Sequence, residues 1–206
     1  NTSLSSVTTY YIFVYAYNNS GSKINYLSTS PLSASTITLT DAPATPTFSS
    51  VNTTSFTIDW TATSGASSYR LDLSTVSDFS SFISGYQDLT VSSTSQAVSG
   101  LTENTLYYAR IRADNASGTS ANSSSGNSPT LSNPPTVSTA TSITTSNLTG
   151  NWTAPANQGS VATTYSIELS LLSNDFSSPV ATAASISSNL SSYQFTGLSI
   201  GTSYYY

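Results

Sequence analysis

The stretch between Gly100 and Gly118 constrains the fold of this chain more than any other. A turn around Leu101 leads into a segment, Tyr107 to Asp114, in which every second residue is Tyr, Ala or Ile and the residues between are mostly polar or charged. Side chains of a β-strand alternate between the two faces of a sheet, so a period of two indicates a strand with one buried face. The pattern therefore predicts a β-sheet protein with a tyrosine at the start of a core strand.

The same combination of a leucine and a later tyrosine occurs three times at a fixed distance. Leu101 lies 97 residues after Leu4, and Leu198 lies 97 residues after Leu101. In each case a tyrosine follows the leucine after six positions, at Tyr10, Tyr107 and Tyr204. Because solenoid repeats have periods of about 20–50 residues, this longer period predicts an array of whole domains.

Further strand patterns recur between these three leucine–tyrosine pairs. Phe56 to Trp60 alternates apolar and polar residues, and Leu148 to Trp152 occupies the matching position in the next repeat. Tyr69 to Leu73 is matched in the same way by Tyr165 to Leu169. Short strands separated by turn-forming residues are typical of an all-β sandwich.

These motifs, in this order, resemble the fibronectin type III family. The resemblance implies tandem immunoglobulin-like β-sandwiches, in which a corner tyrosine fills the core and its hydroxyl satisfies a backbone group. The expected core residues are Trp60, Tyr69, Leu101, Tyr107, Trp152, Tyr165, Leu198 and Tyr204. The resemblance also implies non-catalytic modules.

We expect three segments, of which the middle one is complete. Residues 1–41 would be the last strands of one domain, at Tyr10–Tyr17 and Ser35–Thr40; residues 42–131 a whole domain; and residues 132–206 the first strands of a third. Prolines near both boundaries suit linkers. Two interpretations stay open: a fragment of a longer array, or copies that complete one another head to tail.

Composition excludes several functional classes. The chain has no Cys and no His, so it has neither disulfides nor the usual general base. A net charge of −5 argues against nucleic acid as a partner, and no apolar run is long enough for a membrane helix. The acids are scattered singly, with Asp59 and Asp72 expected to point outward from strands. We therefore expect no cofactor, and only a calcium ion at Asp41 stays open as a metal site.

One face of the first strand is the strongest candidate binding surface. Tyr11, Phe13, Tyr15 and Tyr17 alternate opposite the expected core face. Flat rings offer a large contact area for another protein or for sugars, whereas cross-strand aromatic pairing would merely stabilise the sheet. The matching face of the second repeat carries Tyr108 and two arginines, Arg110 and Arg112, and is expected to be solvated.

Asn-x-Ser/Thr motifs, the acceptors of N-linked glycans, are numerous. They begin at Asn1, Asn18, Asn52, Asn115, Asn122, Asn147, Asn151 and Asn189. A composition this rich in Ser and Thr produces nearly as many by chance, so they are candidate sites without being evidence of glycosylation.

The sequence favours a structural role. We expect an extracellular, cell-surface repeat region of microbial origin that builds a filament, stalk or adhesin, with copies of itself, neighbouring repeats or glycans as partners. The alternatives are spacer domains of a secreted polysaccharide-degrading enzyme and repeats of a phage tail fibre or virion.

Overall fold

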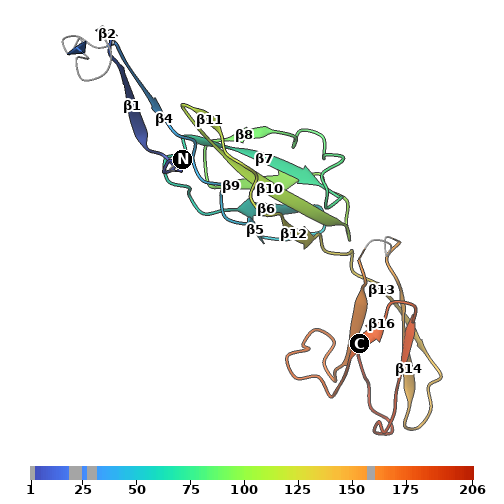
Figure 1. Cartoon of the computed structure of the whole chain (residues 1–206). Coiled ribbons are helices and arrows are strands. Elements are labelled where there is room, and N and C mark those ends of the chain that lie inside the picture. The colour runs from blue at the N-terminus through green and yellow to red at the C-terminus, as the bar shows by residue number, and fades with distance from the viewer. Residues whose placement is uncertain (1–2, 19–24, 27–31, 157–160) are drawn as a thin grey trace. The chain divides into compact units, whose positions relative to one another are not determined.

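The computed structural model describes residues 3–18, 25–26, 32–156 and 161–206, and the side chains of Asn18, Asn25 and Tyr26 are not described. All of its regular structure is strand, which confirms the all-β prediction (Figure 1). The chain divides into two compact units, one of residues 1–50, 56–98 and 107–128 and one of residues 51–55, 99–106 and 129–206. Strand pairing within them defines a hairpin, a middle sandwich and a C-terminal sandwich.

The middle sandwich consists of two antiparallel sheets. The first has the order β5-β6-β9, with bounds Thr47–Ser49, Ser55–Asp59 and Ser95–Ser99. The second has the order β11-β10-β7-β8, and β12 also pairs with β10. Its strands are β7 (Ser68–Ser74), β8 (Leu89–Val91), β10 (Leu106–Asn115), β11 (Gly118–Thr119) and β12 (Gly126–Pro129).

Aromatic side chains join the two sheets of the middle sandwich. The ring of Phe56 on β6 meets the ring of Tyr107 on β10 edge to face, with centroids 5.7 Å apart. Trp60 meets Tyr69 of β7 in the same manner at 5.5 Å. Edge-to-face contacts suit the charge distribution of aromatic rings. The alternation in the sequence therefore produces two apolar faces that bury each other.

The C-terminal sandwich repeats part of this arrangement. One sheet has the order β13-β14-β17, with bounds Thr136–Thr141, Leu148–Thr153 and Ser192–Phe195. The other pairs β15 (Thr164–Leu169) with β16 (Ala181–Ser187). Trp152 and Tyr165 meet edge to face at 5.5 Å, the same separation as their counterparts in the middle sandwich. Identical sequence patterns thus produce the same core contact twice.

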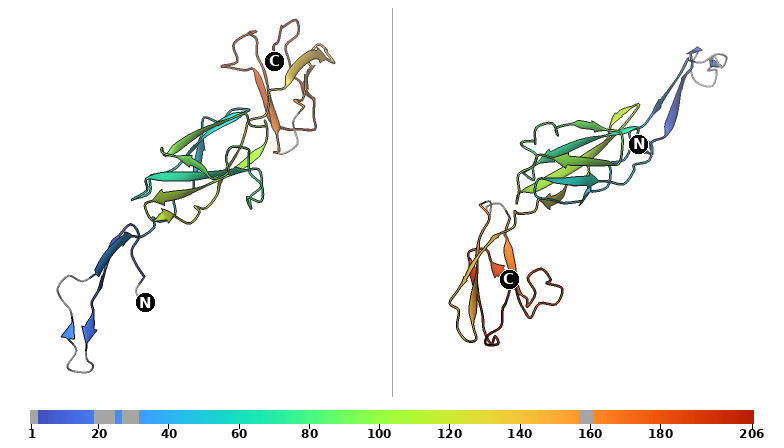
Figure 2. Two further views of the ribbon diagram at one scale, coloured as in Figure 1. Left: turned by 90° about the horizontal axis from the view of Figure 1, so that it is seen from above. Right: turned by 180° about the vertical axis from the view of Figure 1, so that it is seen from behind.

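The first residues form an antiparallel hairpin. β1 (Thr9–Val14) pairs with β4 (Leu32–Ile37), and the short strands β2 (Tyr17–Asn18) and β3 (Asn25–Tyr26) pair beyond it. Among the described residues, β1 and β4 form a two-stranded sheet of their own, and the hairpin can be followed in both views of Figure 2. The sequence predicted strands at Tyr10–Tyr17 and Ser35–Thr40. The structure has a strand at each place with other bounds, since β1 ends at Val14 and β4 spans Leu32–Ile37.

The corner tyrosines satisfy backbone groups at two of the three corners in the same way. The hydroxyl of Tyr10 accepts a hydrogen bond from the backbone N–H of Ser5 at 2.9 Å. The hydroxyl of Tyr204 accepts one from the N–H of Ser199 at 3.0 Å. Both donors lie five residues before the tyrosine, so the spacing seen in the sequence fixes a specific local geometry.

Candidate functional site

The aromatic residues singled out in the first strand lie at the surface. Tyr11, Phe13 and Tyr17 are 67%, 54% and 65% exposed, and Tyr15 is exposed as well. Tyr11 and Phe13 share one face of β1, whereas Tyr17 belongs to β2. The four rings therefore do not form a single stripe along one strand.

The opposite face of the same hairpin is also apolar and exposed. Ile12 and Val14 are 58% and 59% exposed, and Leu32, which pairs with Val14, is 77% exposed. The alternation in β1 predicted that this face would be buried. Within the part of the chain that the structure describes, no second sheet covers this face of the hairpin.

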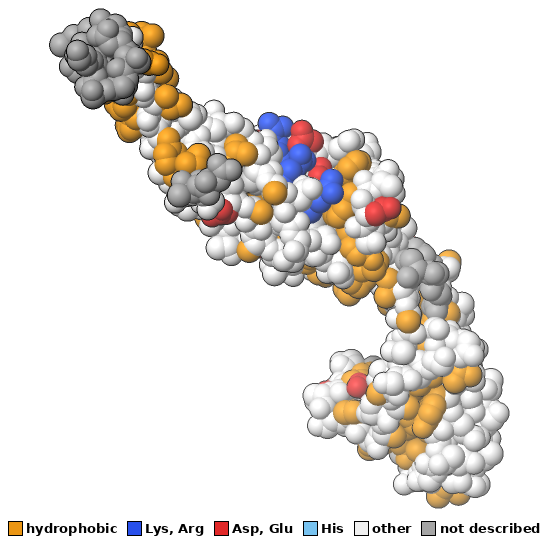
Figure 3. Space-filling view, in the orientation of Figure 1, with side chains coloured by type: hydrophobic (Ala, Val, Ile, Leu, Met, Phe, Trp, Pro, Cys, Tyr) orange, Lys and Arg blue, Asp and Glu red, His pale blue; other side chains and the backbone are white. Residues whose placement is uncertain are grey.

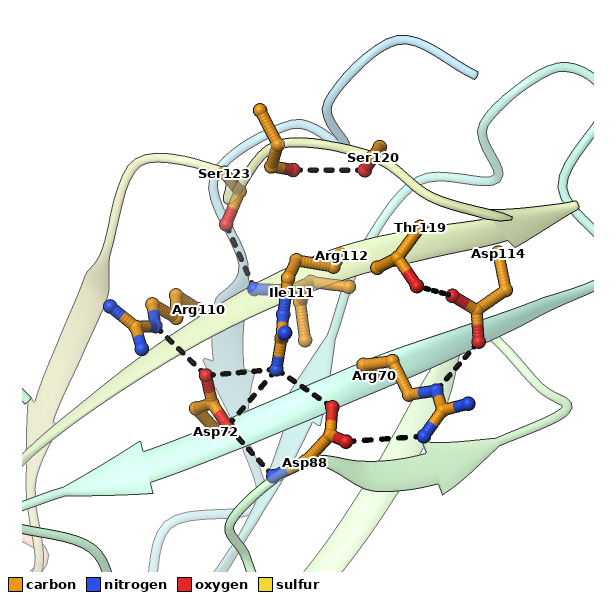
Figure 4. A network of polar contacts seen from close by, with 11 residues as sticks. Arg70, Asp72, Asp88, Arg110, Ile111, Arg112, Asp114, Thr119, Ser120 and Ser123 are labelled. Carbon is orange, nitrogen blue, oxygen red and sulfur yellow. Dashed lines mark hydrogen bonds and ion pairs between the residues drawn. The ribbon is translucent and has the colours of Figure 1, made fainter. Parts of the chain in front are cut away.

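The outer face of β7 and β10 carries a network of charges (Figure 4). Asp72 on β7 is buried, and its carboxylate accepts hydrogen bonds from Arg110 at 2.9 Å and from Arg112 at 3.3 Å. The backbone N–H of Asp88 donates a third, at 2.8 Å. Asp72 therefore lies on the outer face of the strand, as expected, but it is not exposed there. Two arginine side chains from the neighbouring strand cover it.

The network continues along the strands to two further carboxylates. Asp88 accepts hydrogen bonds from Arg112 at 2.8 Å and from Arg70 at 3.2 Å. Arg70 also contacts Asp114 at 2.6 Å. The arginines and aspartates visible as a blue and red cluster in Figure 3 thus neutralise one another. The face expected to be solvated is instead a partly buried structural network.

Asp114 and Arg70 hold each other in their charged forms. Burial acts to raise the pKa of Asp114, but hydrogen bonds from Arg70 and Thr119 and the charges of Arg70 and Arg112 outweigh it, so the pKa lies below the usual range. The hydrogen bond and charge of Asp114, with the charge of Asp88, raise the pKa of Arg70. Both shifts favour the charged forms that make up the ion pair.

The sequence pattern contained an unused signal for this network. Arg70, Arg110 and Arg112 are three of only four cationic residues, and all three fall at outward positions of expected strands. The register of β7 and β10 places Arg110 directly opposite Asp72. Aligning the two strand patterns in register would have brought Arg110 and Asp72 together. Asp88 lies in a loop just before β8, and a loop has no periodic pattern from which its contacts could be predicted.

An open groove lies in the C-terminal sandwich. It has a volume of about 270 Å³ and is lined by Trp152, Tyr165, Ile167, Glu168 and Tyr206 among others. Trp152, Tyr165 and Ile167 belong to the sandwich core, so the groove reaches core side chains from outside. The sequence did not predict this groove. Periodicity shows which face of a strand is buried, but it does not show where a groove opens at the edge of the sheet.

The expected core residues are mostly buried. Trp60, Tyr69, Leu101, Tyr107, Trp152 and Tyr165 have side chains that are less than a tenth exposed. Leu198 and Tyr204 are half-buried and pack against the C-terminal core. The two half-buried residues both lie at the corner that follows β17.

The candidate glycosylation sites fall into two groups. Asn52, Asn122 and Asn189 are exposed. Asn115, Asn147 and Asn151 are half-buried, and the amide of Asn115 donates a hydrogen bond to the backbone oxygen of Thr38 at 2.8 Å. Asn1 lies outside the described residues, and so does the side chain of Asn18.

No group of three or more acidic residues that could hold a metal ion occurs in the described residues. Asp41, the candidate calcium ligand, accepts a hydrogen bond from Ser6 at 2.8 Å, and Asp59 accepts one from Ser49 at 2.6 Å. No helix in the described part of the chain is long and apolar enough to cross a membrane.

Comparison with known proteins points to one family. The model of the fibronectin type III domain matches residues 41–128 and 133–206. No curated protein sequence matches the chain. Among solved structures, a segment of two fibronectin type III domains from chicken tenascin is 22% identical, covers 80% of this chain and 87% of its own, and has a TM-score of 0.44.

Two single domains are also similar. The sixth fibronectin type III domain of human fibronectin type III domain containing protein 3 is 19% identical over 48% of this chain and 93% of its own, with a TM-score of 0.40. A structure named FN3tt mut is 27% identical over 43% of this chain and 93% of its own, with a TM-score of 0.36.

Proposed function

Because the chain belongs to the fibronectin type III family, whose domains are generally non-catalytic structural or adhesion modules, we propose that it is a non-catalytic repeat region of an extracellular filament, stalk or adhesin. We further propose that it acts at a microbial cell surface. Fibronectin type III domains are commonly extracellular, which supports this location.

The repetition of one module carries the proposal. The same tryptophan–tyrosine contact, with ring centroids 5.5 Å apart, occurs in both sandwiches, and the corner leucines recur every 97 residues. The charge network on the middle sandwich is internally neutralised, as expected of a group that stabilises a fold. Short proline-containing linkers act as semi-rigid spacers between modules, which suits a filament or stalk.

We assign residues 1–41 to the end of a preceding fibronectin type III domain. The hydrogen bond between Tyr10 and Ser5 has the same spacing as that between Tyr204 and Ser199 in the C-terminal sandwich. β1 contains the corner tyrosine, Tyr10, and β4 follows it in the chain, as the last two strands of such a domain would. We accordingly divide the chain into residues 1–41, 42–131 and 132–206.

Electron microscopy of the native assembly, with gold-labelled antibodies raised against the middle sandwich, tests the proposed function. We expect label at regular intervals along a filament or stalk on the outside of intact cells. Label that appears only after the cells are permeabilised would contradict an extracellular role.

The same material distinguishes the alternatives. Intact mass of the labelled protein, together with a polysaccharide-hydrolysis assay, would identify a secreted enzyme in which these domains are spacers. Label on phage particles and on no cell surface would identify a virion repeat. Either result would replace the filament, stalk or adhesin that we propose.

A further inference from the structure

Hydrogen bonds tie the end of the last strand of the middle sandwich to a turn. Thr130 directly follows β12 and is 2% exposed. Its hydroxyl donates a hydrogen bond to the backbone oxygen of Thr102 at 2.7 Å and accepts one from the N–H of Thr105 at 3.0 Å. The N–H of Thr130 donates to the oxygen of Thr105 at 3.0 Å, and the N–H of Asn104 donates to the oxygen of Leu131 at 3.0 Å. We call these four hydrogen bonds, which join Thr130 and Leu131 to the turn before β10, the threonine clamp.

The hairpin of β1 and β4 has the same clamp. Thr38 directly follows β4, and its hydroxyl donates to the backbone oxygen of Ser5 at 2.8 Å and accepts from the N–H of Thr8 at 3.0 Å. The N–H of Thr38 donates to the oxygen of Thr8 at 3.1 Å, and the N–H of Val7 donates to the oxygen of Leu39 at 3.2 Å. All four hydrogen bonds therefore recur between matching positions of the repeat.

The turn in the clamp has an unusual backbone conformation at one position. Val7 and Asn104 occupy this position with φ angles of 49° and 46°, and Gly201, at the matching place in the third turn, has a φ of 70°. A β-branched residue such as valine rarely adopts this left-handed conformation. Such a conformation persists where the surrounding structure fixes it, and here the clamp bonds the N–H of Val7 and of Asn104 to a leucine carbonyl.

The clamp lies where the chain leaves the middle sandwich. Tension on the segment after Leu131 therefore reaches this sandwich first at Thr130 and Leu131. The last strand, β12, has only four residues and ends at Pro129. Because proline has no N–H to donate to a sheet, the ladder of β12 lacks a donor at the end that tension reaches first. The clamp supplies hydrogen bonds at that point.

We propose that the threonine clamp is the load-bearing contact of this repeat and keeps the last strand in place when the chain is under tension. The proposal rests on the structural role proposed above, since a filament, stalk or adhesin transmits force along its chain. Both partners of the buried Thr130 hydroxyl are backbone groups, so its loss leaves a donor and an acceptor unsatisfied. The clamp has to break before β12 can peel away from β10.

Force spectroscopy on single molecules of the full chain tests the proposal, because a chain without cysteine can be held at chosen points. Ala42→Cys and Asn133→Cys place two handles at exposed residues on either side of the middle sandwich. Thr130→Val keeps the shape of the side chain and removes its hydroxyl. At constant force we expect Thr130→Val to unfold about tenfold faster than the chain that carries only the handles, because the barrier loses these hydrogen bonds.

Ser120→Ala is the matched control. Ser120 is also buried, and its hydroxyl accepts a hydrogen bond from the N–H of Ala113 at 2.9 Å and donates one to the oxygen of Ala121 at 2.8 Å. It precedes β12, away from the point where the chain leaves the sandwich. We expect Ser120→Ala to lower the stability in denaturant as Thr130→Val does, but to raise the unfolding rate under force by less than about threefold. Equal acceleration by both substitutions, or none by Thr130→Val, would overturn the proposal.

Two further measurements keep the test independent of how well Thr130→Val folds. Thr130→Ser retains the hydroxyl and should keep the lifetime under force of the natural residue. Moving the second handle from Asn133 to Ser125, an exposed residue before β12, leaves the clamp intact and takes it out of the loaded segment. This arrangement should also unfold about tenfold faster at the same force, and an unchanged lifetime would contradict a load-bearing clamp.

The outcome separates this inference from the proposed function. If Thr130→Val has no effect under force while the antibodies still label surface filaments, the chain is structural and other contacts carry the load. If the clamp carries the load while no filament or stalk is labelled, the sandwich resists force but the structural role is wrong.

Discussion

At the scale of single residues, Asp72 decides how the two central strands of the middle sandwich are held together. It is 2% exposed and accepts hydrogen bonds from two arginines and from a backbone N–H. Hydrogen bonds to charged groups contribute more to stability than neutral ones. We therefore expect Asp72→Asn to lower the free energy of unfolding of this sandwich by about 1.5–3 kcal/mol.

Denaturant titration followed by Trp60 fluorescence measures this loss, in a Trp152→Phe background. Asp78→Asn is the matched control, because Asp78 is exposed and its carboxylate accepts hydrogen bonds from the neighbouring Ser80 and from no arginine. The control should change the free energy of unfolding by less than about 0.5 kcal/mol. A loss that is equally small in both variants would show that the network does not stabilise the fold.

Asp114 makes the stability of the middle sandwich depend on pH. Its pKa in the folded protein lies below the value of about 3.9 expected for an unfolded chain. A lowered pKa contributes stability above the unfolded value and loses it as the pH falls through the folded value. The difference in stability between the natural chain and Asp114→Asn should be constant from about pH 7 to 5 and shrink below about pH 4.

Denaturant titrations at several pH values measure that difference directly. A difference that already declines between about pH 7 and 5 would contradict a lowered pKa, because it would place the titration of Asp114 above the usual range of an aspartate.

Side-chain hydrogen bonds also distinguish the candidate glycosylation sites from one another. Asn122 is exposed, whereas the side-chain nitrogen of Asn151 donates to the backbone oxygen of Thr139 at 2.8 Å and to the hydroxyl of Thr141 at 3.0 Å. An N-linked glycan attaches to that same nitrogen. In a eukaryotic secretory host we expect glycans at Asn122 and none at Asn151, as measured by glycopeptide mass spectrometry. Occupancy at Asn151 would show that the glycan is added before this contact forms.

At the scale of strands, two residues at the same position of the repeated strand pattern lie in different environments. Ile111 of β10 is fully buried, and its counterpart Val14 of β1 is exposed. Ile111→Thr removes buried apolar volume and introduces a hydroxyl into the core, so we expect a loss of about 2–4 kcal/mol. Val14→Thr should change the unfolding of the middle sandwich by less than about 0.5 kcal/mol.

Both variants are measured by denaturation with Trp60 as reporter, at a concentration where the chain is monomeric. An equal loss of stability from both substitutions would show that β1 packs into the middle core.

The contrast between β10 and β1 also shows what a sequence pattern can predict. Alternation identified β6, β7 and β10 and the buried rings of Phe56 and Tyr107, because a strand face is a local property of the chain. Alternation does not reveal what covers a face. Burial of Asp72, for example, depends on two arginines of another strand.

At the scale of the whole molecule, each sandwich has its own tryptophan, so the stabilities of the two sandwiches can be measured separately. Trp60 is buried in the middle sandwich and Trp152 in the C-terminal sandwich. The hydrogen bonds of Asp72 all lie within the middle sandwich. We therefore expect Asp72→Asn to lower the unfolding midpoint reported by Trp60 and to leave the midpoint reported by Trp152 unchanged.

Single-tryptophan variants make these readings independent. Trp60→Phe leaves Trp152 as the only tryptophan, and Trp152→Phe leaves Trp60. Neither indole N–H has a hydrogen-bond partner among the described residues, so each substitution costs packing without orphaning a polar group. With Asp72→Asn added, only the variant that keeps Trp60 should show a lowered midpoint. Midpoints that fall together would show that the two sandwiches unfold as one cooperative unit.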